Sequence, residues 1–156
     1  MRHAINVKSQ GHWSGAPVAS VTLGFDDRHR RRIRMRDDQG RAFLLDLPDA
    51  VLLTDGDGLE LDGGGIIAVY AAAEPVADIR CRSMAHAARI AWHIGNRHTA
   101  IQVLDDGSLR ISDDHVLVAM VEGLGAQVMR RDAPFQPEPG AYSPNQQEHG
   151  HDHTHR

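Results

Sequence analysis

In the stretch ADIRCRSMAHAARIAWHIGNRHTAIQVL, residues 77–104, the spacing of the apolar residues changes from that of a strand to that of a helix and back. These two changes decide the fold of the second half of the chain. Apolar and charged residues alternate over residues 77–82, which indicates a strand. Ser83 then stands where a helix N-cap is favoured, and Gly95 stands where a helix is expected to end. Between them the apolar residues recur at helical spacing, namely Met84, Ala87, Ala88, Ala91 and Ile94. Residues 99–104 again follow a strand pattern, so the stretch predicts strand, helix and strand.

The same succession of elements continues downstream. Asp105-Asp106-Gly107 is a hairpin signal that leads into a strand over residues 108–112. Asp113 or Asp114 caps a second helix, whose apolar stripe ends before Gly125 and consists of Leu117, Met120, Val121 and Leu124. Residues 126–131 form a last strand. The resulting order is that of a ferredoxin-like βαββαβ domain, which we expect over residues 76–142.

Upstream, residues 1–75 consist of short strand patterns separated by turn residues. The strand patterns cover residues 17–25, 31–36, 41–47 and 64–72, and turn chemistry occupies residues 37–40, 55–58 and 62–65. We therefore expect a small all-β N-terminal domain, which makes the whole chain an α+β protein. The glycine-rich residues 55–65 lack the Gly-Lys-Ser/Thr ending of a phosphate-binding loop, so they are interpreted as tight turns. Residues 31–36 have one cationic face, for which a partner-binding or nucleic-acid role stays open.

Composition narrows the classes of function. The chain has 156 residues, of which 41% are hydrophobic. Its formal charge of −4 argues against a general nucleic-acid binder, because such domains are normally basic. No apolar run approaches the roughly 18 residues of a membrane-spanning helix, and no secretory signal precedes the domain, so we expect a cytoplasmic protein. The single cysteine, Cys81, excludes an internal disulfide framework and an all-thiolate metal site within one chain. Histidine, with 11 copies, is the unusual residue.

The C-terminal segment carries the densest group of histidines. Residues 133–156 are rich in Pro, Gly, Gln and His, and we expect residues 143–156 to be a disordered tail. Within it, four histidines stand at alternate positions with no apolar residue between them: His149, His151, His153 and His155. Tracts of this composition are typical of metal binding. A solvated tail without a role and the remnant of a purification tag are the alternatives.

Among the other histidines, His98 has the most informative position. It lies just after the end of the predicted helix and just before a strand, in a short loop on a rigid scaffold. One imidazole does not make a tight metal site, but a two-fold axis near His98 would bring two copies together. His86 and His93 lie seven residues apart on the helix, about 10 Å along its axis, which is too far to share one ion. His86 is interpreted as a solvated side chain, whereas for His93, close in sequence to His98, a solvated and a ligand role both stay open.

His115 follows two carboxylates, Asp113 and Asp114. This group suits a divalent metal ion, and it equally suits a helix N-cap, so both interpretations stand. A metal-dependent hydrolase in which His98 or His115 activates water is an alternative function, although no His-Glu-x-x-His motif supports it. An RNA-binding role is a further alternative, but the strand at residues 99–104 lacks the stacking aromatic residues.

Four segments together resemble one known family. They are ASVTLGFDDRHRRRIRMRDDQGRAFLLDLP (residues 19–48), HIGNRHTAIQV (93–103), DDHVLVAMVEGLGAQV (113–128) and APFQPEPGAY (133–142), followed by the histidine tail. With these the chain resembles the UreE family of urease accessory proteins over nearly its whole length. The resemblance implies a nickel metallochaperone and not an enzyme, with a β-rich N-terminal domain, a ferredoxin-like metal-binding domain and a disordered histidine tail.

The resemblance also implies how the metal is held and passed on. It implies a homodimer with the ion on the two-fold axis and His98 of each subunit as principal ligand. We interpret tail histidines, foremost His151, His153 or His155, as the ligands that complete the shell. Ni²⁺ would pass to apo-urease in a complex with the urease accessory GTPase, and Zn²⁺ and Cu²⁺ are further ions that such a site accepts. Some family members have extra histidines just before the segment DHVL, residues 114–117, but at this place the chain has only His115. Its histidine tail is also short. General storage of divalent metal ions is the remaining alternative.

Overall fold

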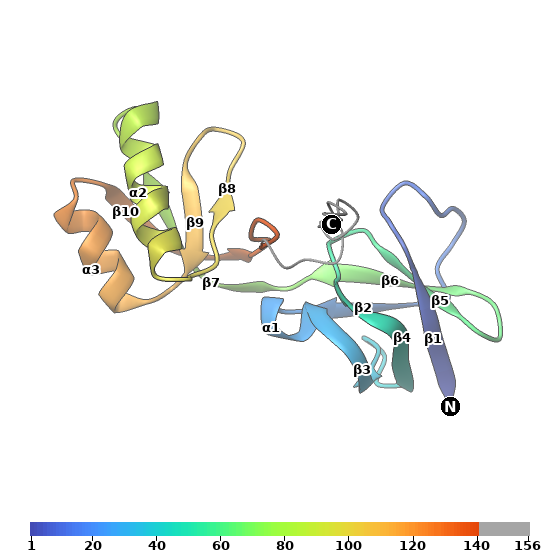
Figure 1. The fold of residues 1–156 in the computed structure, drawn as a ribbon. Helices are drawn as coiled ribbons and strands as arrows, with labels where there is room; N and C mark the ends of the chain where they lie inside the picture. Colours follow the sequence, from blue (N-terminus) through green and yellow to red (C-terminus); the bar gives the residue numbers. More distant parts are fainter. Residues whose placement is uncertain (141–156) are drawn as a thin grey trace, which may run out of the picture.

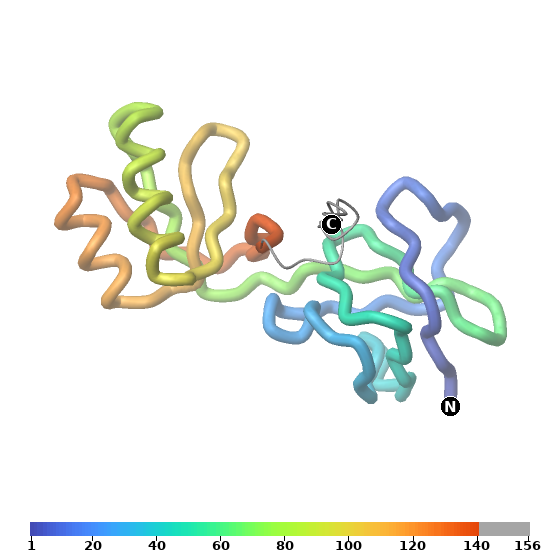
Figure 2. Tube along the Cα trace, viewed as in Figure 1, coloured from blue at the N-terminus to red at the C-terminus, as the bar shows by residue number. Residues whose placement is uncertain are grey.

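The chain folds into two lobes, each built on its own β-sheet (Figure 1). The structure is a computed structural model, and it describes residues 1–140. Figure 2 shows that the chain passes from one lobe to the other along one extended path through β6 and β7, and that β10 lies beside this path. No helix in residues 1–140 is long and apolar enough to cross a membrane. The predicted disordered tail over residues 143–156 falls outside the described residues.

The first lobe contains a six-stranded sheet with the strand order β2-β6-β5-β1-β4-β3. Its strands are β1 (Arg2–Lys8), β2 (Ala19–Leu23), β3 (His29–Arg36), β4 (Ala42–Leu52), β5 (Gly58–Leu61) and β6 (Ile66–Ala71). A short helix, α1 (Phe25–Arg28), connects β2 to β3. Alternate residues of β4, among them Phe43 and Leu45, are buried in the core, and they pair with Met35 and Ile33 of β3. The predicted strands at residues 31–36 and 41–47 are therefore confirmed with alternating burial. The predicted strand at residues 17–25 ends at Leu23, and Phe25 belongs to α1, so the all-β prediction for this lobe is wrong at that helix.

Two strands of this sheet were not among the predicted ones. β1 lies in the middle of the sheet, parallel to β4 and antiparallel to β5, yet Ala4 is its one fully buried residue. Its strand conformation follows from pairing with distant segments, which the local pattern does not report. β5 lies inside the glycine-rich residues 55–65, so the interpretation of that segment as turns alone is wrong for its four central residues.

The second lobe contains a four-stranded antiparallel sheet with two helices. Its elements are β7 (Ala73–Arg80), α2 (Met84–Asn96), β8 (Gln102–Val103), β9 (Leu109–Ser112), α3 (His115–Gly123) and β10 (Gln127–Pro134), with the strand order β10-β7-β9-β8. This succession of strands and helices is the predicted one. Both helices contribute to the same core, which contains Ile90 and Ile94 of α2, Val121 of α3 and residues of β7 and β9. The predicted division between residues 75 and 76 lies inside β7.

The buried face of α2 differs from the predicted stripe. Met84 was expected to face the core, but 91% of it is exposed. The core face is set by Ile90 and Ile94, which lie one turn apart. Because each residue advances about 100° around a helix, Met84 lies about 120° away from Ile90, off that face. The predicted N-cap is confirmed, since the Ser83 hydroxyl accepts a hydrogen bond from the backbone N–H of His86.

A buried arginine joins the two lobes. Arg28 of α1 is fully buried, and its guanidinium donates hydrogen bonds to the backbone carbonyls of Leu53 in the first lobe and Phe135 after β10. The ring of Phe25 packs edge-on against that of Phe135, with centroids 5.3 Å apart. The carboxylate of Glu74 accepts a hydrogen bond from the backbone N–H of Phe25. Burial lowers the pKa of Arg28, and the nearby carboxylates partly offset this effect.

Replacing this arginine should loosen the joint. We expect Arg28→Ala to lower the free energy of unfolding by about 2–4 kcal/mol, because it leaves a cavity and two buried carbonyls without their donor. Urea unfolding followed by circular dichroism measures the change. The control is Arg30→Ala, whose exposed ion pair with Asp27 spans 3.6 Å and should contribute less than about 1 kcal/mol. Equal effects of the two substitutions would contradict a structural role for Arg28.

Candidate metal centre

His98 occupies an unusual backbone position at the end of α2. It has φ = 55°, and it is the only non-glycine residue in residues 1–140 with a positive φ. Its N–H donates to the carbonyl of Gly95 over 2.9 Å, and the N–H of Thr99 donates to the carbonyl of Ile94 over 3.4 Å. These two bonds form a Schellman motif, which ends helices with a left-handed residue. Gly95 lies inside α2, so the prediction that it ends the helix is wrong.

The left-handed position is normally taken by glycine, because a Cβ there costs roughly 1–2 kcal/mol. Here a histidine holds it, with its side chain exposed between α2 and β8. The helix end is fixed by the hydrogen bonds of the Schellman motif, so the direction of the His98 Cα–Cβ bond is fixed with it. An imidazole is thus presented to solvent from a rigid backbone, as a metal ligand requires.

The group around His115 is arranged as a helix cap. The carboxylate of Asp114 accepts hydrogen bonds from the backbone N–H groups of Val116 at 2.9 Å and Leu117 at 3.1 Å. The carboxylate of Asp113 pairs with the guanidinium of Arg130 over 3.0 Å. His115 is the exposed first residue of α3. Of the two interpretations left open for this group, the cap is confirmed for Asp114, and a metal-binding role for His115 stays a prediction.

His86 has a structural role that its sequence position did not reveal. Its Nδ1 atom accepts a hydrogen bond from the backbone N–H of Arg82, and its Nε2 lies 2.8 Å from the carbonyl oxygen of Leu124. Because Nδ1 accepts, Nε2 carries the proton and donates to Leu124. The ring therefore ties the start of α2 to the end of α3, and the interpretation of His86 as a solvated side chain is wrong. His93 is half-buried, and its ring packs edge-on against that of Trp92.

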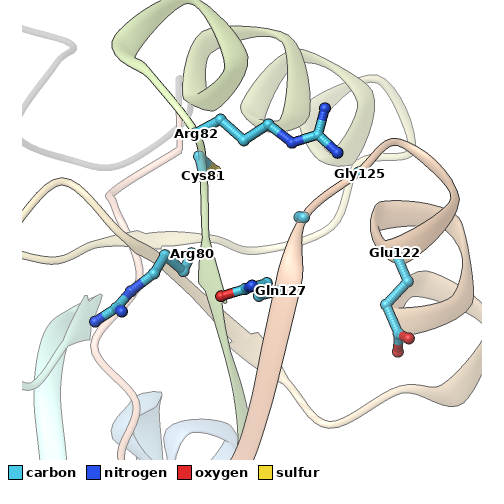
Figure 3. A pocket seen from close by; sticks show the side chains of 7 residues that line it. Arg80, Cys81, Arg82, Glu122, Gly125 and Gln127 are labelled. Atoms are coloured by element: carbon cyan, nitrogen blue, oxygen red, sulfur yellow. The ribbon is translucent and has the colours of Figure 1, made fainter.

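A hollow of about 450 Å³ lies at the opposite end of α2 from His98. It is lined by Arg80, Cys81, Arg82, Glu122, Gly125, Ala126 and Gln127, and Figure 3 shows the side chain of Arg82 extending toward Gly125. Cys81 packs partly against the core, and burial raises the pKa of its thiol. Metal ions bind the thiolate form, so this environment disfavours a sulfur ligand. The hollow is separated from His98 by the length of α2, about 20 Å.

The chain after β10 returns to the vicinity of His98. The N–H of Glu138 donates to the carbonyl of Ile101 over 2.8 Å, and the side-chain oxygen of Gln102 accepts from the N–H of Gln136 over 2.9 Å. These bonds place residues 136–138 along β8. Ile101 is only three residues beyond His98, so their Cα atoms lie at most about 11 Å apart. Sequence reasoning missed this contact, because nothing in the local pattern of residues 135–138 identifies their distant partners.

Within residues 1–140, no three His, Cys, Asp or Glu side chains lie close enough together to hold a metal ion. His98 and His115 are both exposed, but they are not brought into one group with other such side chains. The other predicted ligands lie outside the described residues, namely His149, His151, His153 and His155. The described part of the chain thus supplies single imidazoles rather than a closed cage.

Comparisons with known proteins agree with the sequence resemblance. Residues 2–72 match the family described as UreE urease accessory protein, N-terminal domain, and residues 74–156 match its C-terminal domain. A urease accessory protein UreE of Bradyrhizobium sp. strain BTAi1 is 49% identical over 152 residues, which cover 97% of this chain and 73% of that protein. A protein of the same name from Rhizobium meliloti strain 1021 is 44% identical over 145 residues, 93% of this chain and 91% of the relative.

The backbone of His98 can be tested without any metal. We expect His98→Gly to raise the free energy of unfolding by about 0.5–1 kcal/mol, because glycine adopts a positive φ without steric cost. The control is Asn96→Gly inside the last turn of α2, which should lower stability by a similar amount. Urea unfolding at one pH compares both variants with the wild type. A His98→Gly protein less stable than the wild type would show that the imidazole stabilises the fold.

Proposed function

This chain belongs to the UreE family of urease accessory proteins, and from that premise we propose that it is a nickel metallochaperone that delivers Ni²⁺ to apo-urease. The observation that carries the proposal is His98, an exposed imidazole held by a helix end at a position where glycine would be more stable. Stability alone does not favour a histidine there, and a ligand role gives a reason for it. The family consists of accessory proteins, so the chain is not an enzyme, and the hydrolase alternative with His98 or His115 is set aside.

His98 would act from both subunits of a homodimer. A tight site for a divalent ion needs more than one imidazole, and a two-fold axis beside His98 supplies a second one without another residue. Trp92 lies on α2 two turns before His98, and 64% of it is exposed. An exposed tryptophan is the kind of side chain that subunit interfaces bury. Covering it at the two-fold axis would bring the two His98 loops together.

The tail histidines would complete the ligand shell. Glu138 is held beside β8, and His149 follows it by 11 residues, which span at most about 40 Å. That reach includes His98 of the same subunit. A histidine on a tether acts at an effective concentration in the millimolar range, yet it can dissociate from the ion without disturbing the core of the protein. His151, His153 and His155 add alternative ligands, and a carrier benefits because it must release the ion that it binds.

We further interpret residues 76–142 as a ferredoxin-like metal-binding domain and residues 1–75 as a partner-binding domain. The succession β7-α2-β8-β9-α3-β10 and the strand order β10-β7-β9-β8 support the first assignment. The proposed partners are the cytoplasmic urease accessory GTPase and the apo-urease complex that receives the ion. Zn²⁺ and Cu²⁺ would compete for the same nitrogen ligands, because imidazole binds both ions and the affinity of most such sites is higher for Cu²⁺ than for Ni²⁺.

Nickel binding by His98→Ala tests the anchor. The substitution removes two ligands per dimer, so we expect the dissociation constant of the tightest site to rise at least about tenfold. Equilibrium dialysis at constant pH measures it, and His29→Ala, an exposed histidine of β3, is the control. Dimerisation, followed by analytical ultracentrifugation, should not change. A tight site that survives in His98→Ala would place the metal elsewhere.

Delivery is distinguished from storage by urease activation. The nickel-loaded wild type, mixed with apo-urease and its accessory proteins, should raise urease activity above that obtained with the same total nickel as free ions. A storage protein would bind nickel equally well and would lower the activation, because it competes for the ion.

Two tail variants test whether the tail contributes ligands. Deleting residues 144–156 should weaken nickel binding about tenfold, and it should leave the thermal unfolding of the body unchanged. In the matched variant, the full-length tail keeps its length but has serine in place of His149, His151, His153 and His155. If the histidines are ligands, both variants lose the same affinity. Unchanged affinity in the serine variant would mean that the tail acts without coordinating the ion.

A further inference from the structure

The face of β3 that points away from the core is strongly cationic. Ile33 and Met35 pack into the core of the first lobe, and the residues that alternate with them are Arg32, Arg34 and Arg36, all exposed. Among the ion pairs within residues 1–140, only the one between Arg32 and Asp46 involves these arginines. Its atoms are 3.6 Å apart, and the two side chains are 68% and 37% exposed. Three guanidinium groups therefore stand on one side of a protein whose net charge is −4.

β3 is also the last strand of its sheet. It pairs with β4 on one side, and no strand within residues 1–140 pairs with its other side. The backbone N–H and C=O groups along that side are available for a further strand. β3 has eight residues, which is long enough to pair with a peptide of similar length.

The spacing of the arginines defines what the edge would bind. Alternate residues of a strand lie about 6.8 Å apart on one face, and an added strand has the same repeat. We propose that β3 is a docking edge for an extended segment of a partner protein that carries a carboxylate at every second residue. The backbone of the segment would pair with β3, and its carboxylates would lie opposite the three arginines. This surface is independent of the metal site in the second lobe.

A protein segment fits this surface better than a nucleic acid. The β4 residues paired with Arg32, Arg34 and Arg36 are Asp46, Leu44 and Ala42. None of them is aromatic, whereas single-stranded nucleic acids require rings on which bases stack. The carboxylate of Asp46 would in addition repel phosphate groups. Backbone pairing with a sheet edge is open to a peptide and not to a polynucleotide.

Binding of a labelled peptide tests the proposal. The probe is a dansyl-labelled nonapeptide in which threonine and glutamate alternate, and fluorescence anisotropy follows its binding to the full-length protein. We expect saturable binding that weakens as salt is raised from about 50 to 300 mM, as screening of exposed charges requires. The triple variant Arg32→Gln, Arg34→Gln and Arg36→Gln should raise the dissociation constant at least about tenfold.

Three controls separate recognition of a strand from simple charge attraction. A variant with Arg80→Gln, Arg89→Gln and Arg97→Gln loses the same charge elsewhere on the surface and should bind within about twofold of the wild type. A peptide of the same composition with its glutamates consecutive should bind at least about fivefold more weakly, because only two of its carboxylates can face the arginines. Oligothymidylate of nine nucleotides should bind more weakly than the alternating peptide.

Each opposite result would overturn the proposal. Equal binding of the two peptides, or equal losses in the two triple variants, would mean nonspecific charge attraction. Tighter binding of the oligonucleotide would assign the surface to nucleic acid. If the wild type binds no peptide and the β3 triple variant aggregates, the arginines protect the edge from self-association instead of recruiting a partner.

Discussion

The buried guanidinium of Arg28 is the contact on which the arrangement of the whole chain depends. It lies between the two sheets and donates to carbonyls from both lobes. Its acceptor in the second lobe, Phe135, is the residue from which the chain continues along β8 toward Glu138. The same contact that joins the lobes therefore also directs the C-terminal segment past the His98 loop. A charge is costly to bury, and here hydrogen bonds to carbonyls and the nearby carboxylate of Glu74 offset part of that cost.

The candidate site is built on one rigidly held histidine. His98 is held by the hydrogen bonds of a helix end, which fix its backbone although the conformation is unfavourable for a non-glycine residue. We propose the histidines that follow Glu138 in the sequence as the further ligands. In the proposed carrier, a fixed ligand would set the place where the ion binds. Ligands on a tether would allow the ion to be released. A closed cage of rigid ligands would bind more tightly but would transfer more slowly.

Charge is distributed unevenly over the molecule. The net charge is −4, yet the outer face of β3 carries three arginines in a row. Such a surface attracts acidic partners from a distance and orients them before contact, and these effects fall as ionic strength rises. The His98 loop, where we propose the metal site, and this cationic edge belong to different lobes. One surface can thus engage a partner while the other holds or releases the ion.

The local sequence determined the elements whose hydrophobic period is clear. The strand–helix succession of the second lobe, the Ser83 and Asp114 caps and the hairpin at Gly107 were all predictable, because each depends on residues within one or two turns of the chain. The sequence placed His98 in a loop between a helix and a strand, which is where the structure has it, and its role as a metal ligand stays a prediction. Only the tertiary structure decided that β1 occupies the middle of its sheet, that His86 bonds to Leu124 and that residues 136–138 run along β8. Each of these contacts joins residues that are far apart in the chain but lie within one lobe, so it depends on how that lobe folds and not on any local pattern.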